Sequence, residues 1–411
     1  MTFKDLHLDA KILKAVAEQN YTTPTPIQEK TIPLVVDGID VIGCAQTGTG
    51  KTAAFALPIL NRLIPQQNAL KGNKKIKALI VSPTRELAIQ IEENFKTYST
   101  YTNLRTTSIY GGMAMDPQID ILTKGVDVLV ATPGRLLDLH KRDLINLDFI
   151  QVLVLDEADM MLDMGFIDDV KKIAKLCPSQ RQTLLFSATM PPKIESLANE
   201  LLNEPERVSV SVISSAAKTI SQELYLVPKP KKIELCLHLL RNDLRGNIII
   251  FRRTKFGVDK LEETLLKNKY KVDTIHGDKT QAARTKALNK FKNNDVNILI
   301  ATDVAARGID IPNLDIVINF DLPNIPEGYV HRIGRTGRAG KEGRALSFCS
   351  ADEKPYLKDI QQLIGKLIPV EENHPYPLDP KAKPEVHKKQ GSKYKKGRKS
   401  EASKAKKKRW Y

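Results

Sequence analysis

The sequence has few cysteines and no long hydrophobic run, and each shortage excludes a class of protein. Its four cysteines, Cys44, Cys177, Cys236 and Cys349, lie far apart and form no Cys-x-x-Cys pair, which argues against a disulfide framework or a zinc site. No apolar run approaches the length that spans a membrane, and the first residues lack the apolar core of a signal peptide. We therefore expect a soluble, cytoplasmic protein with no membrane contact.

Acidic residues are scarce at the C-terminal end of the chain. From Lys381 to Tyr411 there are fourteen Lys and Arg against two Glu, so this stretch holds +12 of the net charge of +16 and leaves +4 for residues 1–380. A stretch so poor in apolar residues cannot bury enough surface to offset its ordering entropy, so we predict a disordered basic tail over residues 369–411. One interpretation is a tail that keeps the protein in solution. We favour a binder of nucleic-acid phosphates, with Tyr394, Trp410 and Tyr411 available to stack on bases.

The remaining residues are numerous enough for two hydrophobic cores. Apolar runs such as "KALIVS", "DVLVA" and "TLLFSAT", and later "NIIIFRRT", "NILIATD" and "IVINFD", are typical of strands buried on both faces of a parallel sheet. Helical stretches such as residues 51–63, 86–98 and 256–269 separate such runs. We predict an α/β fold of two doubly wound domains, 1–207 and 222–368, joined by a linker over 208–221 that is rich in serine and small residues.

The stretch "AQTGTGKT", Ala45 to Thr52, has the composition of a loop that holds nucleotide phosphates. Gly48 and Gly50 let backbone N–H groups turn inward, and Lys51 adds a mobile cation. The loop departs from the pattern G-x-x-x-x-G-K-[ST] only at Ala45, and it follows a predicted strand and opens a predicted helix, where the helix dipole favours anions. The predicted nucleotide contacts here are Ala45, Gln46, Thr47, Gly48, Thr49, Gly50, Lys51 and Thr52.

Two carboxylates follow directly after the strand in "VLVLDEAD". Asp156 is placed to hold Mg²⁺, with Thr52 as the other predicted ligand, and Glu157 to orient or deprotonate an attacking water. Acidic residues at strand ends are often merely solvated, but a phosphate loop upstream in the same domain favours the functional interpretation.

The amide of Gln28 in "PTPIQ" can both donate and accept, which matches the N6 and N7 edge of adenine. Tyr21 or Phe3 is available to pack on the ring. The alternative is a turn that ends in an exposed glutamine.

In the second half, "HRIGRTGRAG" spaces Arg332, Arg335 and Arg338 three residues apart, along one face if the segment is helical. Clustered guanidiniums usually bind anions, and the flanking glycines suggest close approach of the backbone. The alternative is an exposed basic helix.

Together these motifs resemble those of the DEAD-box ATP-dependent RNA helicases of superfamily 2. In family order the chain has "TPTPIQ", "AQTGTGKT", "PTRELA", "GG" at residues 111–112, "TPGR", "DEAD" and "SAT", then "IIIFRRT", "HGDKTQAAR", "IATDVAARGIDI" and "HRIGRTGR". The start of the chain and the loop before the last motif look most like the bacterial RhlE-type subgroup. Asn20 departs from the family, which commonly has Gly there, whereas Ala45 follows the family's habit.

The resemblance implies two RecA-like domains that close on ATP, Mg²⁺ and RNA together. Asp310 would contact the ribose, Arg335 and Arg338 would reach the γ-phosphate, and Ser187, Thr189 and His331 would couple hydrolysis to duplex opening. The implied contacts to the RNA backbone are Pro83, Thr84, Arg85, Gly112, Thr132, Gly134 and Arg135 in the first domain and Gly277 and Thr302 in the second.

The expected function is therefore an ATP-dependent RNA helicase that opens short duplexes locally. Ribosome assembly or RNA turnover is the expected setting, with ribosomal or RNA-degradation proteins as partners and a monomer as the working form. Phosphate and ribose contacts of these kinds bind RNA largely without reading its sequence. Two alternatives stay open, a DNA helicase or translocase and a non-enzymatic RNA clamp or annealing protein.

Overall fold

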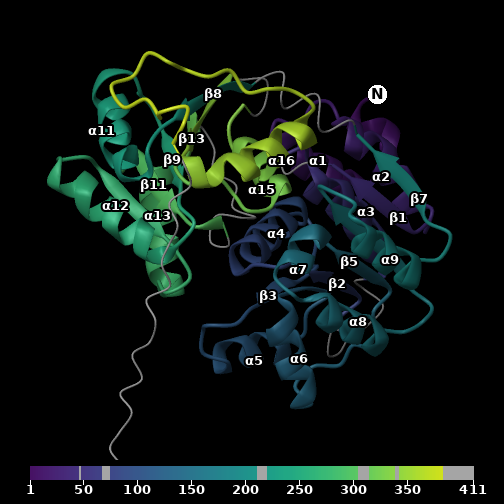
Figure 1. The fold of residues 1–411 in the computed structure, drawn as a ribbon. Helices are drawn as coiled ribbons and strands as arrows, with labels where there is room; N and C mark the ends of the chain where they lie inside the picture. Colours follow the sequence, from purple (N-terminus) through teal and green to yellow (C-terminus); the bar gives the residue numbers. More distant parts are fainter. Residues whose placement is uncertain (46–47, 67–74, 211–219, 304–313, 338–341, 383–411) are drawn as a thin grey trace, which may run out of the picture.

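The computed structural model describes residues 1–45, 48–66, 75–210, 220–303, 314–337 and 342–382. These residues form two α/β domains, which appear as two lobes, purple to teal for the first and green to yellow for the second (Figure 1). The predicted α/β fold of two parallel-sheet domains is confirmed.

The first domain is built on a seven-stranded sheet of order β3-β4-β2-β5-β6-β1-β7, in which every described pairing is parallel. Its elements are η1 (Phe3–Leu6), α1 (Ala10–Glu18), α2 (Pro26–Val36), β1 (Val41–Cys44), α3 (Lys51–Leu63), η2 (Ile64–Gln66), β2 (Ala78–Val81), α4 (Arg85–Tyr98), β3 (Thr106–Ile109), α5 (Asp116–Thr123), β4 (Val128–Ala131), α6 (Pro133–Lys141), β5 (Val152–Leu155), α7 (Ala158–Asp163), α8 (Ile167–Leu176), β6 (Gln182–Ser187), α9 (Pro192–Leu201) and β7 (Glu206–Ser209).

The second domain repeats the design with a six-stranded sheet of order β10-β11-β9-β12-β13-β8, again with parallel pairings. Its elements are β8 (Ile220–Leu226), η3 (Lys229–Lys231), α11 (Lys232–Asn242), β9 (Ile248–Phe251), α12 (Lys255–Lys267), β10 (Val272–Ile275), α13 (Gln281–Lys292), β11 (Ile298–Ala301), β12 (Ile316–Asn319), α15 (Pro326–Ile333), β13 (Gly343–Cys349), η4 (Ala351–Glu353) and α16 (Lys354–Ile364).

Each sheet has a hydrophobic core on both of its faces. Ile80 of β2 belongs to one cluster of buried side chains and its neighbour Leu79 to another, and Ile249 and Ile250 of β9 divide in the same way. Successive side chains of a strand point to opposite faces, so continuous apolar strands require helices on both sides. This arrangement leaves the carboxyl ends of the strands, and the loops that follow them, to carry the polar motifs.

The boundaries between the domains and the tail differ in detail from the prediction. Strand β7 runs to Ser209 and β8 starts at Ile220, so both strands reach into the predicted linker, of which residues 211–219 lie outside the described residues. Residues 369–378, predicted as the start of the tail, lie along β8, where the Leu224 N–H donates to the Pro369 carbonyl (2.8 Å) and the Leu378 N–H to the Leu226 carbonyl (2.9 Å). Strand β8 is the edge of its sheet, and an edge strand offers unpaired backbone groups that a following segment can satisfy. Residues 383–411 lie outside the described residues.

Candidate functional site

Glycines shape the loop between β1 and α3. Gly48 and Gly50 have φ angles of 90° and 92°, in the left-handed region that favours glycine. A Cβ on Gly50 would meet the amide of Gln28. Because α3 begins at Lys51, its unpaired N–H groups and the positive end of its dipole face this loop.

The loop opens on a cavity of about 200 Å³ in the first domain. Among the described residues it is lined by Tyr21, Gln28, Gly48, Gly50, Lys51, Thr52, Ala53, Leu87, Gln90, Asn94, Tyr98, Asp156 and Glu157. Most of the predicted nucleotide contacts thus meet in one place. Ala45 is buried behind the loop, where its N–H donates to the Ser187 carbonyl (3.1 Å), and Thr49 is not part of the lining. Gln46 and Thr47 lie outside the described residues.

A buried ion pair lies in this cavity at the start of α3. Lys51 Nζ lies 2.9 Å from Glu157 Oε1, and both side chains are 5% exposed. Burial alone would raise the pKa of Glu157, but Lys51 and then His331 of the second domain outweigh it and lower that pKa. Burial raises the pKa of the neighbouring Asp156, because Lys51 only partly offsets burial and the Glu157 charge. The pair of carboxylates therefore holds more negative charge than Lys51 neutralises.

The backbone of Glu157 is strained. It adopts φ 53° and ψ 54° directly before α7, a left-handed conformation that costs a residue other than glycine about 1–3 kcal/mol. Such strain is concentrated at functional sites, where the surrounding structure maintains it. Here it accompanies the turn that brings the carboxylate to Lys51.

Gln28 is buried and its amide makes contacts within the protein. Its Oε1 accepts from the Thr25 N–H (2.9 Å) and its Nε2 donates to the Gly50 carbonyl (3.2 Å), so it joins the start of α2 to the phosphate loop. Tyr21 lines the cavity, whereas Phe3 is buried behind it with the two rings stacked at 6.4 Å. Of the two predicted aromatic contacts, only Tyr21 is placed at the cavity.

Residues of the second domain reach this site from α15. His331 Nε2 lies 3.6 Å from Asp159 Oδ2 of α7, and that same oxygen accepts from the N–H and the hydroxyl of Thr189 (2.9 Å each). The Ser187 hydroxyl accepts from the Asp159 N–H (3.2 Å) and donates to the Thr189 carbonyl (2.7 Å). Arg335 is 3% exposed, and its charge lowers the pKa of Glu157 across the domain boundary. Asp310 and Arg338 lie outside the described residues.

Arg332 and Arg335 were expected to lie along one face if their segment is helical, and that condition is not met at Arg335. Helix α15 ends at Ile333, and Gly334 is its C-cap. Arg332 is buried inside its own domain, where its guanidinium pairs with both oxygens of Asp303 and donates to the Asp321 carbonyl (2.6 Å). It therefore stabilises the second domain and is not placed to bind a ligand anion.

A larger cavity, about 500 Å³, gathers the predicted RNA contacts of both domains. Its lining is Pro83, Thr84, Arg85, Glu86, Gly111, Thr132, Gly134, Arg135, Asp138, Met164, Phe166, Gly277 and Arg284. A Cβ on Gly134 or Gly277 would meet no atom within 4 Å, so glycine leaves open space here for a ligand backbone. Arg135 donates to the Met113 carbonyl (3.0 Å) and keeps its buried Nη1 without a partner among the described residues.

The other two predicted RNA contacts lie outside this lining. Gly112 has φ 78°, and a Cβ there would collide with the guanidinium of Arg85, so glycine is required for Arg85 to occupy its place. The Thr302 N–H donates to the Ile275 carbonyl (3.2 Å) at the carboxyl ends of β11 and β10.

Sequence reasoning missed the residues that join the domains beside this cavity. Glu86 of α4 accepts from Gln281 Nε2 (2.9 Å) and lies 3.0 Å from Arg284 Nη2, both from α13. It also missed Gln90, Asn94 and Tyr98 in the nucleotide cavity. Their spacing of three or four residues after Leu87 places them on one face of α4, and this spacing was the available signal.

The described residues contain neither a candidate membrane-spanning helix nor a candidate metal-ligand cluster. No helix there is long and apolar enough to cross a membrane. Nor do the described residues contain three or more His, Cys, Asp or Glu side chains arranged to hold a metal ion.

Comparison with known families and proteins agrees with this geometry. The DEAD/DEAH box helicase profile matches residues 25–197, and the helicase conserved C-terminal domain profile matches residues 231–340. The chain is 45% identical to the ATP-dependent RNA helicase CshA of Listeria monocytogenes, over 89% of this chain and 69% of the relative. It is 44% identical to the DEAD-box ATP-dependent RNA helicase RhpA of Helicobacter pylori, over 89% of this chain and 73% of the relative. These names do not support the RhlE-type placement.

Two solved structures share the arrangement of both domains. One is S. cerevisiae Dbp5 bound to RNA and ADP BeF3, with 31% identity, a TM-score of 0.82 and coverage of 90% of this chain and 95% of that one. The other is Mss116p bound to ssRNA and AMP-PNP, with 31% identity, a TM-score of 0.81 and coverage of 91% and 80%. Since each alignment spans about nine-tenths of this chain, the likeness extends to both of its domains.

Proposed function

This chain belongs to the DEAD/DEAH box helicase family and is an ATP-dependent RNA helicase, and on that premise we propose how its two RecA-like domains divide the work. ATP binds in the cavity of the first domain, and Arg335 of the second domain completes the site. The observation that carries this proposal is electrostatic. His331 and Arg335 act on Glu157 from the other domain, so the charge balance of the site depends on the approach of the two domains.

On the nucleotide side, the loop N–H groups from Gly48 to Thr52 and the Lys51 ammonium hold the phosphates, and Glu157 orients the attacking water. Gln28 and Tyr21 face the base. The amide of Gln28 is hydrogen-bonded to both Thr25 and Gly50. A base that contacts this amide would therefore also affect the position of the phosphate loop. By family resemblance, Asp310 contacts the ribose and Arg338 the γ-phosphate.

Mg²⁺ fits the donors at this site. Thr52 and Asp156 line the same cavity, and a bound cation would favour the ionised form of Asp156, whose pKa is raised by burial first and by the charge of Glu157 after it. Because Mg²⁺ usually takes only one or two carboxylates besides phosphates and water, no larger acidic cluster is needed. Held by Thr52 and Asp156, the ion would supply neutralisation of phosphate charge.

On the RNA side, the 500 Å³ cavity is the backbone-binding site, with Thr84, Arg85, Thr132 and Arg135 from one domain and the Gly277 region from the other. Hydroxyls, glycines and arginines grip phosphate and ribose without reading bases, so binding is largely independent of sequence. An RNA strand that contacts both domains favours the closed form. ATP turnover thereby depends on RNA, and the strand is held in a shape that its duplex cannot keep.

We propose further that the protein acts in the cytoplasm as a monomer on RNA in ribosome assembly or turnover. The near-neutral body and the polycationic tail support an RNA of no fixed sequence as the substrate.

The test is RNA-stimulated phosphate release combined with unwinding of a short RNA duplex and of the DNA duplex of the same sequence. We expect ATP turnover that rises with RNA, and opening of the RNA duplex only. Preference for the DNA duplex would favour a translocase, and absence of turnover would favour a non-enzymatic RNA clamp.

A further inference from the structure

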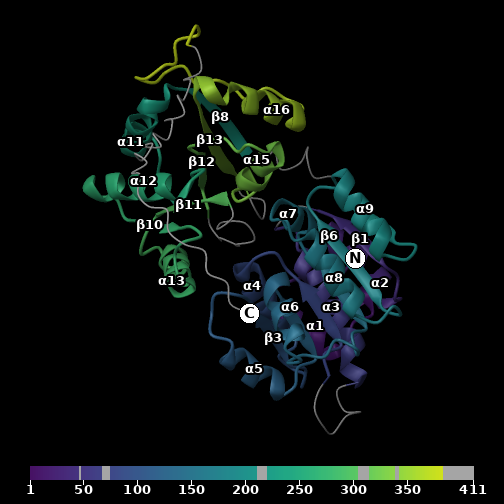
Figure 2. The same ribbon diagram turned by 60° about the horizontal axis from the view of Figure 1, so that its bottom comes forward.

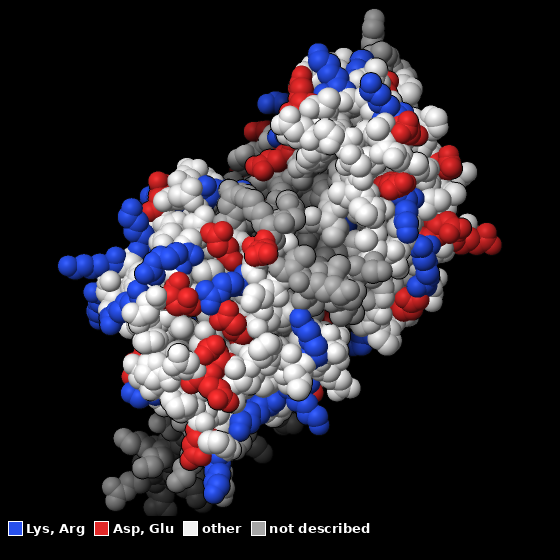
Figure 3. Space-filling view, turned by 90° about the horizontal axis from the view of Figure 1, so that it is seen from above, with Lys and Arg blue, Asp and Glu red and all other residues white. Residues whose placement is uncertain are grey.

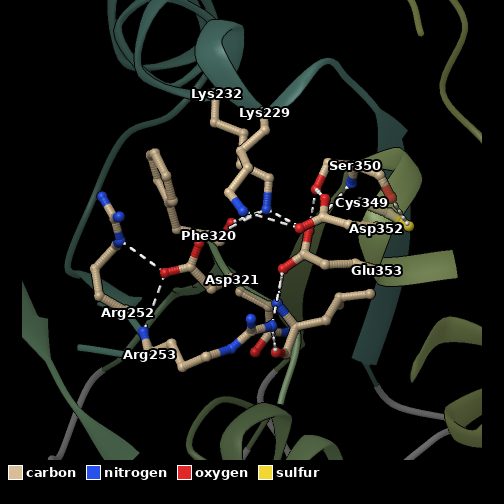
Figure 4. A network of polar contacts seen from close by, with 12 residues as sticks. Lys229, Lys232, Arg252, Arg253, Phe320, Asp321, Cys349, Ser350, Asp352 and Glu353 are labelled. Atoms are coloured by element: carbon tan, nitrogen blue, oxygen red, sulfur yellow. Dashed lines mark hydrogen bonds and ion pairs between the residues drawn. The ribbon is translucent and has the colours of Figure 1, made fainter. Parts of the chain in front are cut away.

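A cluster of buried charges lies in the second domain, outside the nucleotide and RNA cavities (Figure 4). At its centre the carboxylate of Glu353, which is 2% exposed, accepts from Lys232 Nζ (2.5 Å) and Arg253 Nη2 (3.1 Å). It also accepts from the Leu322 N–H (3.1 Å), the Ser350 N–H (3.1 Å) and the Ser350 hydroxyl (2.8 Å). Both carboxylate oxygens are therefore fully engaged.

Such a cluster adds little net stability to a fold, because burying its charges costs desolvation free energy. Lys232 is 2% exposed, and besides Glu353 its Nζ contacts the Phe320 carbonyl (2.7 Å) and, at 3.7 Å, Asp321 Oδ1. Desolvation of each buried ion costs several kcal/mol, and an apolar pair of the same volume is often at least as stable. A buried ion pair is better suited to fixing one conformation than to adding stability.

The conformation that this cluster fixes is that of the strand ends. Arg253 follows β9, Asp321 and Leu322 follow β12, and Ser350 follows β13. Asp321 Oδ2 accepts from Arg252 Nε (2.8 Å) and the Arg253 N–H (3.0 Å). Although burial would raise the pKa of Asp321, the charges of Arg252 and Lys232 lower it, so this carboxylate stays ionised.

From these strand ends the contacts lead directly to α15. Both backbone groups of Leu322 are engaged by the cluster, since its N–H donates to Glu353 and its carbonyl accepts from Arg253 Nη2 (2.8 Å). Helix α15 begins four residues later. Near its end, Arg332 returns to the same strand exit and donates to the Asp321 carbonyl (2.6 Å). The helix is thus connected to the exit of β12 through the short chain segment before its start and through the Arg332 hydrogen bond near its end.

We propose that Glu353 is a positioning residue for ATP hydrolysis, which fixes the exit of β12 and through it the orientation of α15. This helix and the turn after it present His331 and Arg335 to Asp159 and Glu157 of the first domain. The inference rests on the proposed function, because it assigns Glu353 an effect on the arginine that completes the site. Glu353 itself touches no nucleotide and acts only through Leu322 and α15.

The test is Glu353→Gln, which keeps the size of the side chain and removes its charge. A misplacement of about 1 Å far from the chemistry can lower turnover up to a hundredfold, so we expect kcat of the RNA-stimulated ATPase to fall by about tenfold or more. Affinity for a fluorescent ADP should stay within about twofold, because the described lining of the nucleotide cavity comes from the first domain alone.

Two variants separate positioning from stability. Lys229→Ala removes the neighbouring Lys229–Asp352 pair (2.9 Å), which is partly exposed and is not one of the hydrogen bonds to Glu353 and Leu322 described above, so its kcat should match the wild type. Lys232→Met removes the buried cation and should lower Tm, but it leaves the contacts of Glu353 to Leu322 and Arg253 in place. At a temperature below both unfolding transitions, its kcat should therefore fall much less than that of Glu353→Gln.

An unchanged kcat in Glu353→Gln would overturn the inference, and so would losses of kcat that simply follow Tm across the variants. If Glu353→Gln yields no folded protein, Arg253→Met carries the same expectation, because it breaks the other backbone contact of Leu322 from a side chain that is 34% exposed. Arg335→Ala distinguishes a failure of the proposed function from a failure of the positioning role of Glu353. Wild-type turnover in Arg335→Ala would reject the proposed function itself, whereas a loss there with none in Glu353→Gln would reject only the positioning role.

Discussion

Glu157 combines three properties that single it out among the carboxylates of the first domain. It is buried, its backbone is in the left-handed region, and it is paired with Lys51 at 2.9 Å. We expect Glu157→Gln to lower RNA-stimulated turnover by about 10²–10⁴-fold, the contribution of a positioned general base. Nucleotide binding should persist, because the amide oxygen can still accept from Lys51. Phosphate release and nucleotide affinity measure the two effects.

Lys51→Ala serves as the comparison for this variant, since it should weaken nucleotide binding itself. Wild-type turnover in Glu157→Gln would reject the assignment of Glu157.

Gln28 makes structural contacts to Thr25 and Gly50, and we propose that it also reads the base; one variant tests both roles. Gln28→Ala removes the contacts to Thr25 and Gly50, and loss of the N-terminal capping contact of α2 should cost about 1 kcal/mol of stability. The preference for ATP over GTP should fall as well, because a fixed amide presents the wrong order of donor and acceptor to guanine. Thermal unfolding and turnover with both nucleotides measure these effects. Equal use of ATP and GTP by the wild type would leave Gln28 only its capping role.

At the scale of elements, α4 is the helix that lines both cavities. Its N-terminal residues Arg85 and Glu86 face the RNA cavity, and Gln90, Asn94 and Tyr98 further along face the nucleotide cavity. A rigid helix with both contacts offers a direct physical connection between the two ligands. The turn before α5 leaves room for the guanidinium of Arg85 because residue 112 is glycine.

We expect Gly112→Ala to weaken RNA binding and spare nucleotide binding. The added Cβ collides with the guanidinium of Arg85 at a left-handed backbone position, and losing one charged hydrogen bond to phosphate lowers affinity about tenfold. Fluorescence anisotropy with labelled RNA measures the loss. Unchanged RNA affinity would mean that Arg85 does not contact the strand.

Helices α4 and α13 also join the two domains through Glu86. Glu86→Ala leaves the buried Arg284 without its carboxylate, and removing one partner of a buried pair is strongly destabilising. Because this pair joins the two domains, we expect the loss to destabilise the closed arrangement of the domains. RNA affinity in the presence of an ATP analogue should be at least about tenfold weaker. Energy transfer between labels on the two domains reports closure. Lys171→Ala, which breaks the exposed Lys171–Glu200 pair of the first domain, should change nothing, and an equal effect there would contradict the prediction.

Across the whole molecule, the two domains face each other through α4 and α7 of the first domain and α13 and α15 of the second (Figure 2). The face seen from above shows Lys and Arg interspersed with Asp and Glu, without a region of one sign (Figure 3). This agrees with a net charge of only +4 for residues 1–380. Since residues 381–411 carry +12 of the net charge, we propose that they supply most of the long-range attraction for RNA.

Deletion of residues 381–411 should raise the RNA concentration needed for half-maximal ATPase activity and leave the maximum rate unchanged. Contacts to phosphate release counterions, so the loss should be large at low salt and shrink as salt rises. RNA titrations at two salt concentrations, with the full-length and shortened proteins, measure this. The same RNA requirement and salt slope in both proteins would reduce the tail to a solubilising role, and a lower maximum rate would show that it packs on the body.

Much of the fold and the motifs at the strand ends could be predicted from the amino-acid sequence. Apolar runs predicted the strands of both sheets other than β7 and β8, and residues 51–63 form the predicted helix α3. The phosphate loop and the Asp156–Glu157 pair could be predicted because each follows the end of a strand, whereas the expected RNA contacts from Pro83 to Arg135 came only from the family resemblance.

Which of two arginines with the same spacing lies at the domain boundary could be learned from the tertiary structure alone. Arg332 and Arg335 are equivalent in the pattern, yet Asp303 and the end of α15 bury one within its domain and leave the other at the boundary. Glu86 meets Gln281 across 195 residues of sequence, and residues 369–378 cover β8 where composition predicted a free tail. Local composition and periodicity carry no information about such partners, because the pairing exists only once the sheets have formed and brought distant side chains together.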